Sequence, residues 1–339
     1  MPTIKDVAKE SGYSLSTVSR VINNHPYVTE EKRQKVYAAM KKLGYVPNSV
    51  AQKLRKNKVE TIAIIISRII NPFFSMLVDE MEKAAYEHGY QLILCNTRQD
   101  KEREIKYLNL LKTKQIDGII LASMENEWKT IEPYMAYGPI VLCNEYRDDA
   151  SAPMVKLDQI DACYKATKHL IELGHKKIAF CGGNDEIPLS LDRKKGFLEA
   201  IKEADINLPH YWFFEHAYGI DDGKRIVKEI HDLQDKPTAI FTCADEVAAG
   251  FIRQAKILGY RIPEDFAVVG FDDQPLADLI SPGLTTVYQP IRIMVEKTME
   301  IMLDMTEKGI DCEGRVELIP NRLIIRGSTS NKKLALPED

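Results

Sequence analysis

The sequence predicts an α/β protein with a small three-helix head and two doubly wound parallel-sheet lobes. Its 339 residues exceed what one ordinary hydrophobic core holds. Residues 1–46 contain three short amphipathic helical patterns, and residues 61–330 alternate apolar strand-like runs with helical ones. Such alternation is typical of parallel sheets that helices cover on both faces.

The three helices of the head have recognisable start and stop signals. Thr3, Ser14 and Thr29 can each cap the first turn of a helix. Gly12 and Gly44 are suited to end the first and third helices. Two short helices joined by a tight turn, with a third helix supporting them, form a helix-turn-helix.

The second helix of the head is expected to contact DNA. In a helix-turn-helix, the beginning of this helix reads base edges in the major groove. Arg20 can donate to both acceptors of guanine, and Leu15 and Ser16 lie on the same exposed side. Short hydroxyl and amide side chains suit phosphate contacts, although they can equally cap the helix. These are Ser14, Thr17, Ser19 and Asn23.

The charge distribution agrees with a nucleic-acid partner for the head alone. The whole chain has a net charge of −4. Residues 1–60 contain 12 Lys and Arg against 5 Asp and Glu, a net charge of +7, so the remainder carries −11. A basic head on an acidic body is expected where only the head meets phosphates. A merely solvated basic face is the alternative.

Two motifs of the head resemble those of the LacI/GalR (lac-repressor) family of bacterial transcriptional regulators. They are T-V-S-R-V-I-N, from Thr17 to Asn23, and G-Y-V-P-N, from Gly44 to Asn48. The resemblance covers essentially the whole chain. It implies periplasmic-binding-protein-like lobes, a homodimer and double-stranded operator DNA as partner. By this resemblance the DNA-binding residues also include Thr3, Tyr45, Asn48, Ala51 and Leu54.

Residues 47–60 are expected to form a hinge. The segment is basic and too short to be a stable helix alone, so it should order only on DNA. The resemblance implies that it lies in the minor groove beside its dimer mate, with Leu54 wedged between base steps. An inert linker is the alternative.

Residues 61–330 are expected to form the two lobes. The N-lobe comprises about 61–160 and 291–319, and the C-lobe about 161–290 and 320–330. Expected strands are 61–67, 91–97, 118–123, 139–144, 154–158, 177–182, 211–216, 239–244, 266–272 and 284–288. Expected helices lie near 73–88, 101–114, 127–135, 190–204, 221–233, 245–258 and 290–307. Segments near 159–163, 289–292 and 320–326 should cross between the lobes.

A small ligand is expected in a cleft between the lobes, beyond the C-terminal strand ends. Arg193 in R-x-x-G-F and Asp272 in G-F-D-D match, by resemblance, the family's main polar ligand contacts. Phe73 or Tyr218 could stack on the apolar face of a sugar. Further candidates are Ser67, Asn71, Asn144 and Asp245. Structural ion pairs and helix caps are the alternative roles.

This mixture of side chains suits a neutral, hydroxyl-rich effector. The stretch from Glu104 to Gly118 is also similar to repressors of maltodextrin or oligosaccharide utilisation. A purine-type corepressor or a global carbon regulator of the same family is the alternative. Whether the ligand favours or opposes DNA binding is left open, because either lobe arrangement could fit it better.

Other classes of protein fit less well. An exported solute-binding protein would not need the basic head, and residues 1–6 show no apolar signal core, so a cytoplasmic location is expected. The longest apolar run, 62–66, is too short for a membrane span. Six cysteines lie far apart, and the seven histidines lack metal spacing, so no metal or cofactor is expected. An enzyme using Asp272 and Asp273 is a further alternative, although no catalytic motif is present.

Overall fold

The computed structural model describes residues 2–23, 25–46, 58–185 and 187–329. Internal contacts divide the chain into a head that ends at Val59 and a body that begins at Glu60. The expected hinge residues 47–57 lie outside the described part of the chain.

The head contains the three expected helices. They are α1 (Ile4–Ser11), α2 (Leu15–Ile22) and α3 (Glu30–Leu43). Thr3 and Asp6 form the capping box of α1, and the hydroxyl of Ser14 accepts from the backbone N–H at the start of α2. Thr29 precedes α3, but its side chain makes no capping hydrogen bond.

The head has its own small core. One buried side of each helix contributes to it, and its fully or nearly fully buried members are Val7, Val18, Val21, Val36 and Ala39. An ion pair of 2.6 Å between Lys42 and Glu10 also joins α3 to α1. The apolar contacts outweigh this exposed pair, because surface ion pairs typically contribute less than about 1 kcal/mol.

The N-lobe contains a parallel sheet of six described strands in the order β11-β5-β4-β3-β1-β2. Its strands are β1 (Thr61–Ile66), β2 (Gln91–Asn96), β3 (Gly118–Leu121), β4 (Ile140–Cys143), β5 (Met154–Leu157) and β11 (Val316–Ile319). Its helices are α5 (Pro72–Glu87), α6 (Lys101–Lys112), α7 (Trp128–Ile131), the 3-10 helix η1 (Glu132–Tyr137) and α13 (Ile291–Glu307).

The C-lobe repeats this plan in the order β12-β10-β9-β8-β6-β7, with β12 antiparallel to β10. Its strands are β6 (Ile178–Cys181), β7 (Phe213–Phe214), β8 (Ala239–Thr242), β9 (Ala267–Asp272), β10 (Thr285–Tyr288) and β12 (Arg322–Ile324). Its helices are α8 (Gln159–Glu172), α9 (Pro188–Glu203), η2 (His210–Trp212), α10 (Ile220–Asp232), α11 (Asp245–Ile257) and α12 (Leu276–Leu279).

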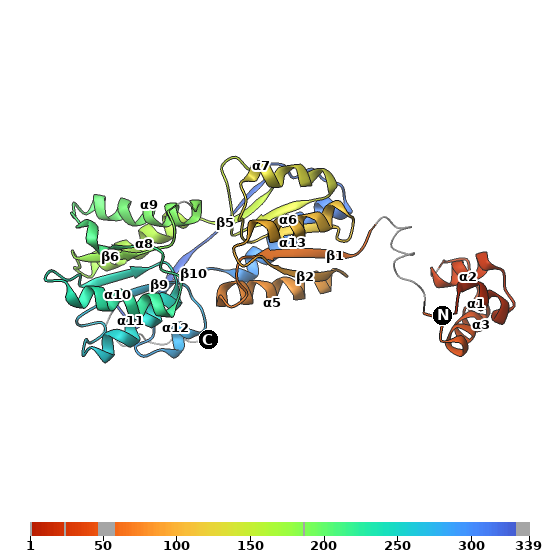
Figure 1. The fold of residues 1–339 in the computed structure, drawn as a ribbon, viewed down its shortest axis with the longest axis horizontal. Helices are drawn as coiled ribbons and strands as arrows, with labels where there is room; N and C mark the ends of the chain where they lie inside the picture. The colour runs from red at the N-terminus through yellow and green to blue at the C-terminus, as the bar shows by residue number, and fades with distance from the viewer. Residues whose placement is uncertain (1, 24, 47–57, 186, 330–339) are drawn as a thin grey trace. The chain divides into compact units, whose positions relative to one another are not determined.

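Both sheets are covered on both faces, as Figure 1 shows for the body. In the N-lobe, α5 and α13 pack on one face and α6 and α7 on the other. In the C-lobe, α8 and α9 cover one face and α10 and α11 the other. One apolar cluster runs through both lobes, because buried side chains of α8, α13 and both sheets contact one another. The predicted fold class is therefore confirmed.

The chain passes between the lobes at three places: from β5 into α8, from β10 into α13, and from β11 into β12. The first two crossings begin directly at carboxyl ends of parallel strands. Polar residues at these strand ends are therefore brought to the region where the lobes meet.

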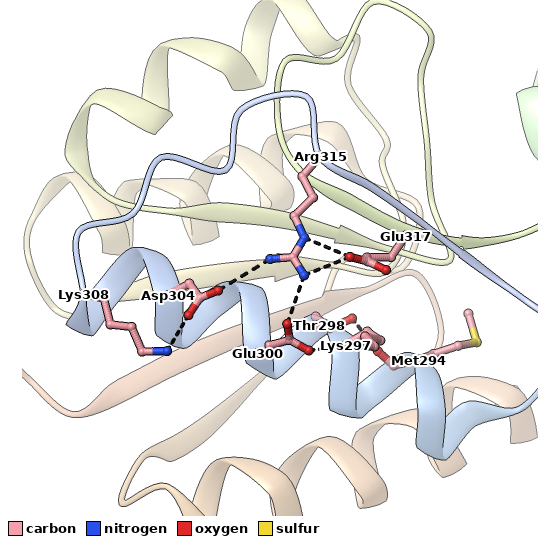
Figure 2. A network of polar contacts seen from close by, with 8 residues as sticks. All are labelled: Met294, Lys297, Thr298, Glu300, Asp304, Lys308, Arg315 and Glu317. Carbon is pink, nitrogen blue, oxygen red and sulfur yellow. Dashed lines mark hydrogen bonds and ion pairs between the residues drawn. The ribbon is translucent and has the colours of Figure 1, made fainter.

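The edge strand β11 is held by an ionic network (Figure 2). The guanidinium of Arg315 binds Glu300 of α13 at 3.0 Å and Glu317 of β11 at 2.8 Å. Asp304, which also pairs with Lys308 at 2.7 Å, lies 3.5 Å from the same guanidinium. The network adds contacts to an edge strand on which Val316 and Leu318 are exposed and Ile319 is buried.

Five segments differ from the predicted elements. The sequence analysis predicts no strand at β11 or β12 and no helix at α12. Within 211–216 only β7 is a strand, because the aromatic residues before it form η2 and bury Trp212. The segment 159–172, of which the first residues were expected only as a crossing, forms the long helix α8.

Candidate DNA-binding and effector sites

The helix α2 presents a free polar side because its opposite side is anchored in the head core. Val18 and Val21 are fully buried, whereas Ser16 and Arg20 are exposed and Leu15 keeps 44% of its surface exposed. Leu15 is not among the described side chains that form the head core or pack against it. The three exposed side chains share the accessible side of the helix that the sequence predicted to read bases.

The candidate phosphate-contacting side chains are already engaged with their own helix. The hydroxyl of Ser14 lies 2.8 Å from that of Ser16 and 2.9 Å from that of Thr17. At the other end, the amide nitrogen of Asn23 donates to the carbonyl oxygen of Ser19 at 2.7 Å. Capping and phosphate contact are compatible, because a hydroxyl can accept from a backbone N–H and still donate its own proton.

The remaining predicted DNA-binding residues fall into two groups. Thr3 caps α1, and its backbone N–H and its hydroxyl donate to the Asp6 carboxylate at 2.7 and 2.8 Å, which lowers the pKa of that carboxyl. Tyr45 is half-buried and packs against the head core. Asn48, Ala51 and Leu54 lie outside the described residues.

In the body, six buried polar residues gather where the lobes meet, and we call them the interlobe cluster. They are Asn144, Gln159, Arg193, Asp272, Gln274 and Gln289, each at most 8% exposed. Asn144 follows β4, Asp272 ends β9 and Gln289 follows β10, so the cluster lies at carboxyl ends of strands. Parallel α/β sheets typically bind ligands there.

Arg193 is fixed from three sides within this cluster. Its Nε donates to Oε1 of Gln159 at 2.8 Å, and an Nη donates to the carbonyl oxygen of Cys243 at 2.8 Å. Its guanidinium carbon lies 3.8 Å from the centre of the Phe271 ring. The motif R-x-x-G-F explains this placement, because a Cβ on Gly196 would lie only 2.1 Å from the carbonyl oxygen of Ile160. The glycine therefore lets α9, which carries Arg193, approach the first turn of α8.

Asp272 is held by two amides. Gln289 donates to Oδ1 at 2.6 Å and Gln274 to Oδ2 at 3.2 Å. Burial raises the pKa of the Asp272 carboxyl to about 6, and nearby Arg193 partly offsets this. The backbone φ of Asp272 is 109° and that of Asn144 is 56°, conformations that side chains rarely adopt and that concentrate at functional sites.

Two hydrogen-bonded links join the lobes at this site. Gln159, at the start of α8, binds Arg193 and lies 3.5 Å from Oδ1 of Asn144 in the N-lobe. The hydroxyl of Tyr146, which follows β4, donates to Asp192 of α9 at 2.6 Å. We call the second contact the Tyr146–Asp192 bond.

Three predicted effector residues have structural roles. Asn71 caps α5 by accepting from the N–H of Phe73, and Phe73 itself is 4% exposed and packs in the main core. Asp245 is fully buried and accepts from the hydroxyl of Thr286 at 2.6 Å and from the N–H of Gln274 at 2.7 Å. Burial raises the pKa of the Asp245 carboxyl well above its usual range.

The last two predicted residues lie nearer the surface, close to strand ends. Ser67 follows β1 and is half-buried. Tyr218 is 43% exposed, and its ring centroid lies 6.5 Å from that of His216. The side-chain hydrogen bonds of the described residues connect Arg193, Asp272 and Asn144 to the interlobe glutamines, and they do not extend to Ser67 or Tyr218.

The sequence reasoning missed the glutamines and the Tyr146–Asp192 bond. Gln159, Gln274 and Gln289 each follow a predicted strand end within two residues, and this position was the available signal. Within the described residues, no group of His, Cys, Asp and Glu could hold a metal ion, and no helix is long and apolar enough to cross a membrane.

Comparison with known proteins identifies both parts of the chain. Residues 3–48 match the family model of bacterial regulatory proteins of the lacI family, and residues 167–329 match a periplasmic binding protein-like domain. The NTD biosynthesis operon regulator NtdR of Bacillus subtilis (strain 168) is 41% identical over 97% of this chain and 100% of its own length. The repressor PurR of Vibrio vulnificus (strain CMCP6) is 36% identical over 96% and 98%.

Solved structures agree. The lac repressor dimer bound to operator and the anti-inducer ONPF has a TM-score of 0.86 and 25% identity, covering 97% of this chain and 99% of that one. The regulator CelR in complex with cellobiose has a TM-score of 0.73 and 27% identity, covering 97% and 100%. A LacI family regulator from Lactobacillus casei with bound glucose has a TM-score of 0.72 and 29% identity, covering 79% and 99%.

NtdR and PurR are both more than 30% identical to this chain over at least 96% of its length. The predictions of a DNA-binding head, a ligand-binding body and no enzymatic activity are confirmed at this level. The chain therefore belongs to the LacI family of DNA-binding transcriptional repressors, a family without enzymatic activity.

Proposed function

We propose that this repressor binds operator DNA as a homodimer in the cytoplasm, and controls carbohydrate-utilisation genes in response to a sugar held by the interlobe cluster. One observation carries the choice of effector site. Arg193 and Asp272 are each held by neutral partners, and no ion pair between them occurs among the described residues. Both charged groups can therefore bind hydroxyls, the guanidinium as donor and the carboxylate as acceptor.

On the DNA side, Leu15, Ser16 and Arg20 are the proposed base-reading residues, because they are exposed on the anchored helix α2. The hydroxyl and amide residues at both ends of α2, with Thr3 and Tyr45, are the proposed backbone contacts. The hinge contacts Asn48, Ala51 and the Leu54 wedge remain part of the proposal through the family resemblance.

A sugar suits the site better than a planar base. Purine recognition generally uses an aromatic face, and of the two aromatic candidates Phe73 is 4% exposed within the core. Two of the solved relatives carry cellobiose and glucose. An oligosaccharide of the maltodextrin type is the finer form of this proposal. The similarity to PurR keeps a purine corepressor as the second candidate.

A gel-shift experiment tests the DNA-binding half. Operators selected from random duplexes by the full-length protein should be bound preferentially, and salt should weaken binding. Leu54→Ala should reduce operator affinity if the hinge wedges into the minor groove. Unchanged affinity of this variant would contradict the wedge, and a lack of preference for any selected duplex would contradict the proposal.

A thermal-shift screen tests the effector half. A ligand that binds only the folded protein raises its melting temperature. A panel of sugars and nucleobases should give a shift with a sugar, and Arg193→Gln should abolish that shift. A shift produced by a nucleobase alone would instead establish the purine candidate.

A further inference from the structure

The surroundings of Asp272 contain more hydrogen-bond acceptors than donors. An ionised carboxylate only accepts, so the amide nitrogens of Gln274 and Gln289 must face it and their oxygens must point elsewhere. Both residues are 2% exposed, and both Oε1 atoms are buried without a hydrogen-bond partner among the described residues. Buried acceptors without donors are rare in native proteins, and they usually mark a place for a bound molecule or water.

The three acceptor groups lie close together. Each glutamine is bonded through its nitrogen to the same carboxylate, so each orphan oxygen lies within one amide group of Asp272. A molecule that satisfies all three groups must bring several donors to one small region. A hydroxyl brings one donor and two acceptor lone pairs, whereas a primary ammonium brings three donors and no acceptor.

The local charge favours a cation. Asp245 and Glu246 at the start of α11 both interact unfavourably with the negative charge of Asp272. The nearby cation Arg193 uses two of its five N–H donors for Gln159 and the Cys243 carbonyl and lies over the Phe271 ring, so it can still donate to ligand hydroxyls. Arg193 offsets part of the cost of burying the Asp272 charge, but no ion pair joins the two among the described residues, so a positive charge on a ligand would stabilise the carboxylate further.

We propose that the effector carries a primary ammonium group that binds to Asp272 and to the amide oxygens of Gln274 and Gln289. The effector is then an amino sugar, with its remaining hydroxyls facing Arg193 and Asn144. This inference rests on the proposed sugar-binding function and narrows its ligand class.

Matched pairs of sugars test the charge directly. Binding to the full-length protein at pH 7 is measured by calorimetry for D-glucosamine, D-galactosamine and D-mannosamine, for the three parent hexoses, and for the three N-acetyl derivatives. At least one amino sugar should bind tenfold or more tightly than both its parent and its N-acetyl form, because a buried charge-assisted hydrogen bond is about twice as strong as a neutral one.

Two variants localise the effect. Glu246→Gln should reduce the preference for the amine by removing one acidic neighbour, and it leaves the hydrogen bonds of Asp272 intact. Asp272→Asn should abolish binding of the amine. Equal or tighter binding of the parent sugars, or no binding by any amino sugar, overturns the inference. A parent sugar that binds would leave the proposed repressor function intact, whereas failure of the operator gel shift would challenge that function separately.

Discussion

Asp272 should cost the empty protein stability, so that replacing it with asparagine is stabilising. In the folded protein the pKa of its buried carboxyl is about 6, against an ordinary value of 3.8. One pKa unit corresponds to about 1.4 kcal/mol, so ionising the buried carboxyl at neutral pH costs about 3 kcal/mol of unfolding free energy. The Asp272→Asn side chain carries no charge, and either glutamine could rotate its amide to accept from the new NH₂ group.

The pH dependence gives this prediction its sign. Because the pKa of Asp272 is higher in the folded than in the unfolded protein, the folded state binds more protons between about pH 4 and 6. Its stability therefore rises as the pH falls through that interval. The advantage of Asp272→Asn should shrink from at most about 3 kcal/mol at pH 7.5 to about 1.6 kcal/mol at pH 5.

Urea unfolding of the ligand-free protein at fixed concentration measures this difference. Trp128 in the N-lobe and Trp212 in the C-lobe are both buried, so their fluorescence reports on both lobes. Asp273→Asn is the matched control, because it removes a neighbouring charge that pairs with Arg326 at 2.8 Å and should therefore lose stability. An Asp272→Asn variant that is less stable at pH 7.5, or whose difference from the parent protein does not change with pH, would refute the reasoning.

Three further predictions concern the two sites. Arg20→Ala should weaken operator binding by about 1–3 kcal/mol and relax specificity at one base pair. The control Lys35→Ala removes an equal charge from α3, and it should leave the specificity measured by binding-site selection unchanged. Tyr146→Phe should weaken effector binding by up to about tenfold in calorimetry if the bound state keeps the Tyr146–Asp192 bond and the free protein also populates lobe arrangements without it, because a hydrogen bond to a carboxylate contributes about 1.5 kcal/mol or more. Tyr164→Phe is the control, because it loses a bond to Glu203 within the C-lobe and should bind the effector normally. Gly196→Ala should lower the free energy of unfolding in urea by about 1–3 kcal/mol, because the added methyl group overpacks the contact between α9 and α8. It should also reduce effector affinity, because α9 carries Arg193. Unchanged affinity would show that Gly196 does not position the effector site.

Local signals in the sequence were sufficient for the helix starts and most strands. Thr3 with Asp6, and Ser14, act within one turn of their own helices, so no distant contact is needed to predict them. Roles that depend on tertiary packing were harder to predict from the sequence. Phe73 follows a strand end just as a ligand-contacting residue would, but the packing of α5 on the sheet turns it into the core.

The interlobe glutamines are site residues that the sequence analysis did not predict. Gln159, Gln274 and Gln289 each follow a predicted strand end, but this position alone does not distinguish a buried amide from one at the surface. Their importance arises from burial beside charged groups, which the crossing segments of the two lobes create. The edge strand β11 was missed because its alternate side chains face solvent, and distant ionic contacts with α13 hold it in place.

The connectivity also constrains how an effector can influence DNA binding. The chain from the head enters the body at β1 in the N-lobe, whereas Asp272 and Arg193 belong to the C-lobe. A signal from these C-lobe contacts must therefore reach the N-lobe, either through the ligand at Asn144 or through protein contacts between the lobes. Besides the three chain crossings, the Tyr146–Asp192 bond and the Asn144–Gln159 contact carry polar coupling at this junction. Two such bonds, at about 0.5–3 kcal/mol each, can supply the coupling free energy of about 1–3 kcal/mol that is typical of allosteric proteins. Gln159 links the lobes and also accepts a hydrogen bond from Arg193. A ligand that binds the Arg193 guanidinium in place of Gln159 would therefore change the contact between the lobes directly, without further residues in between.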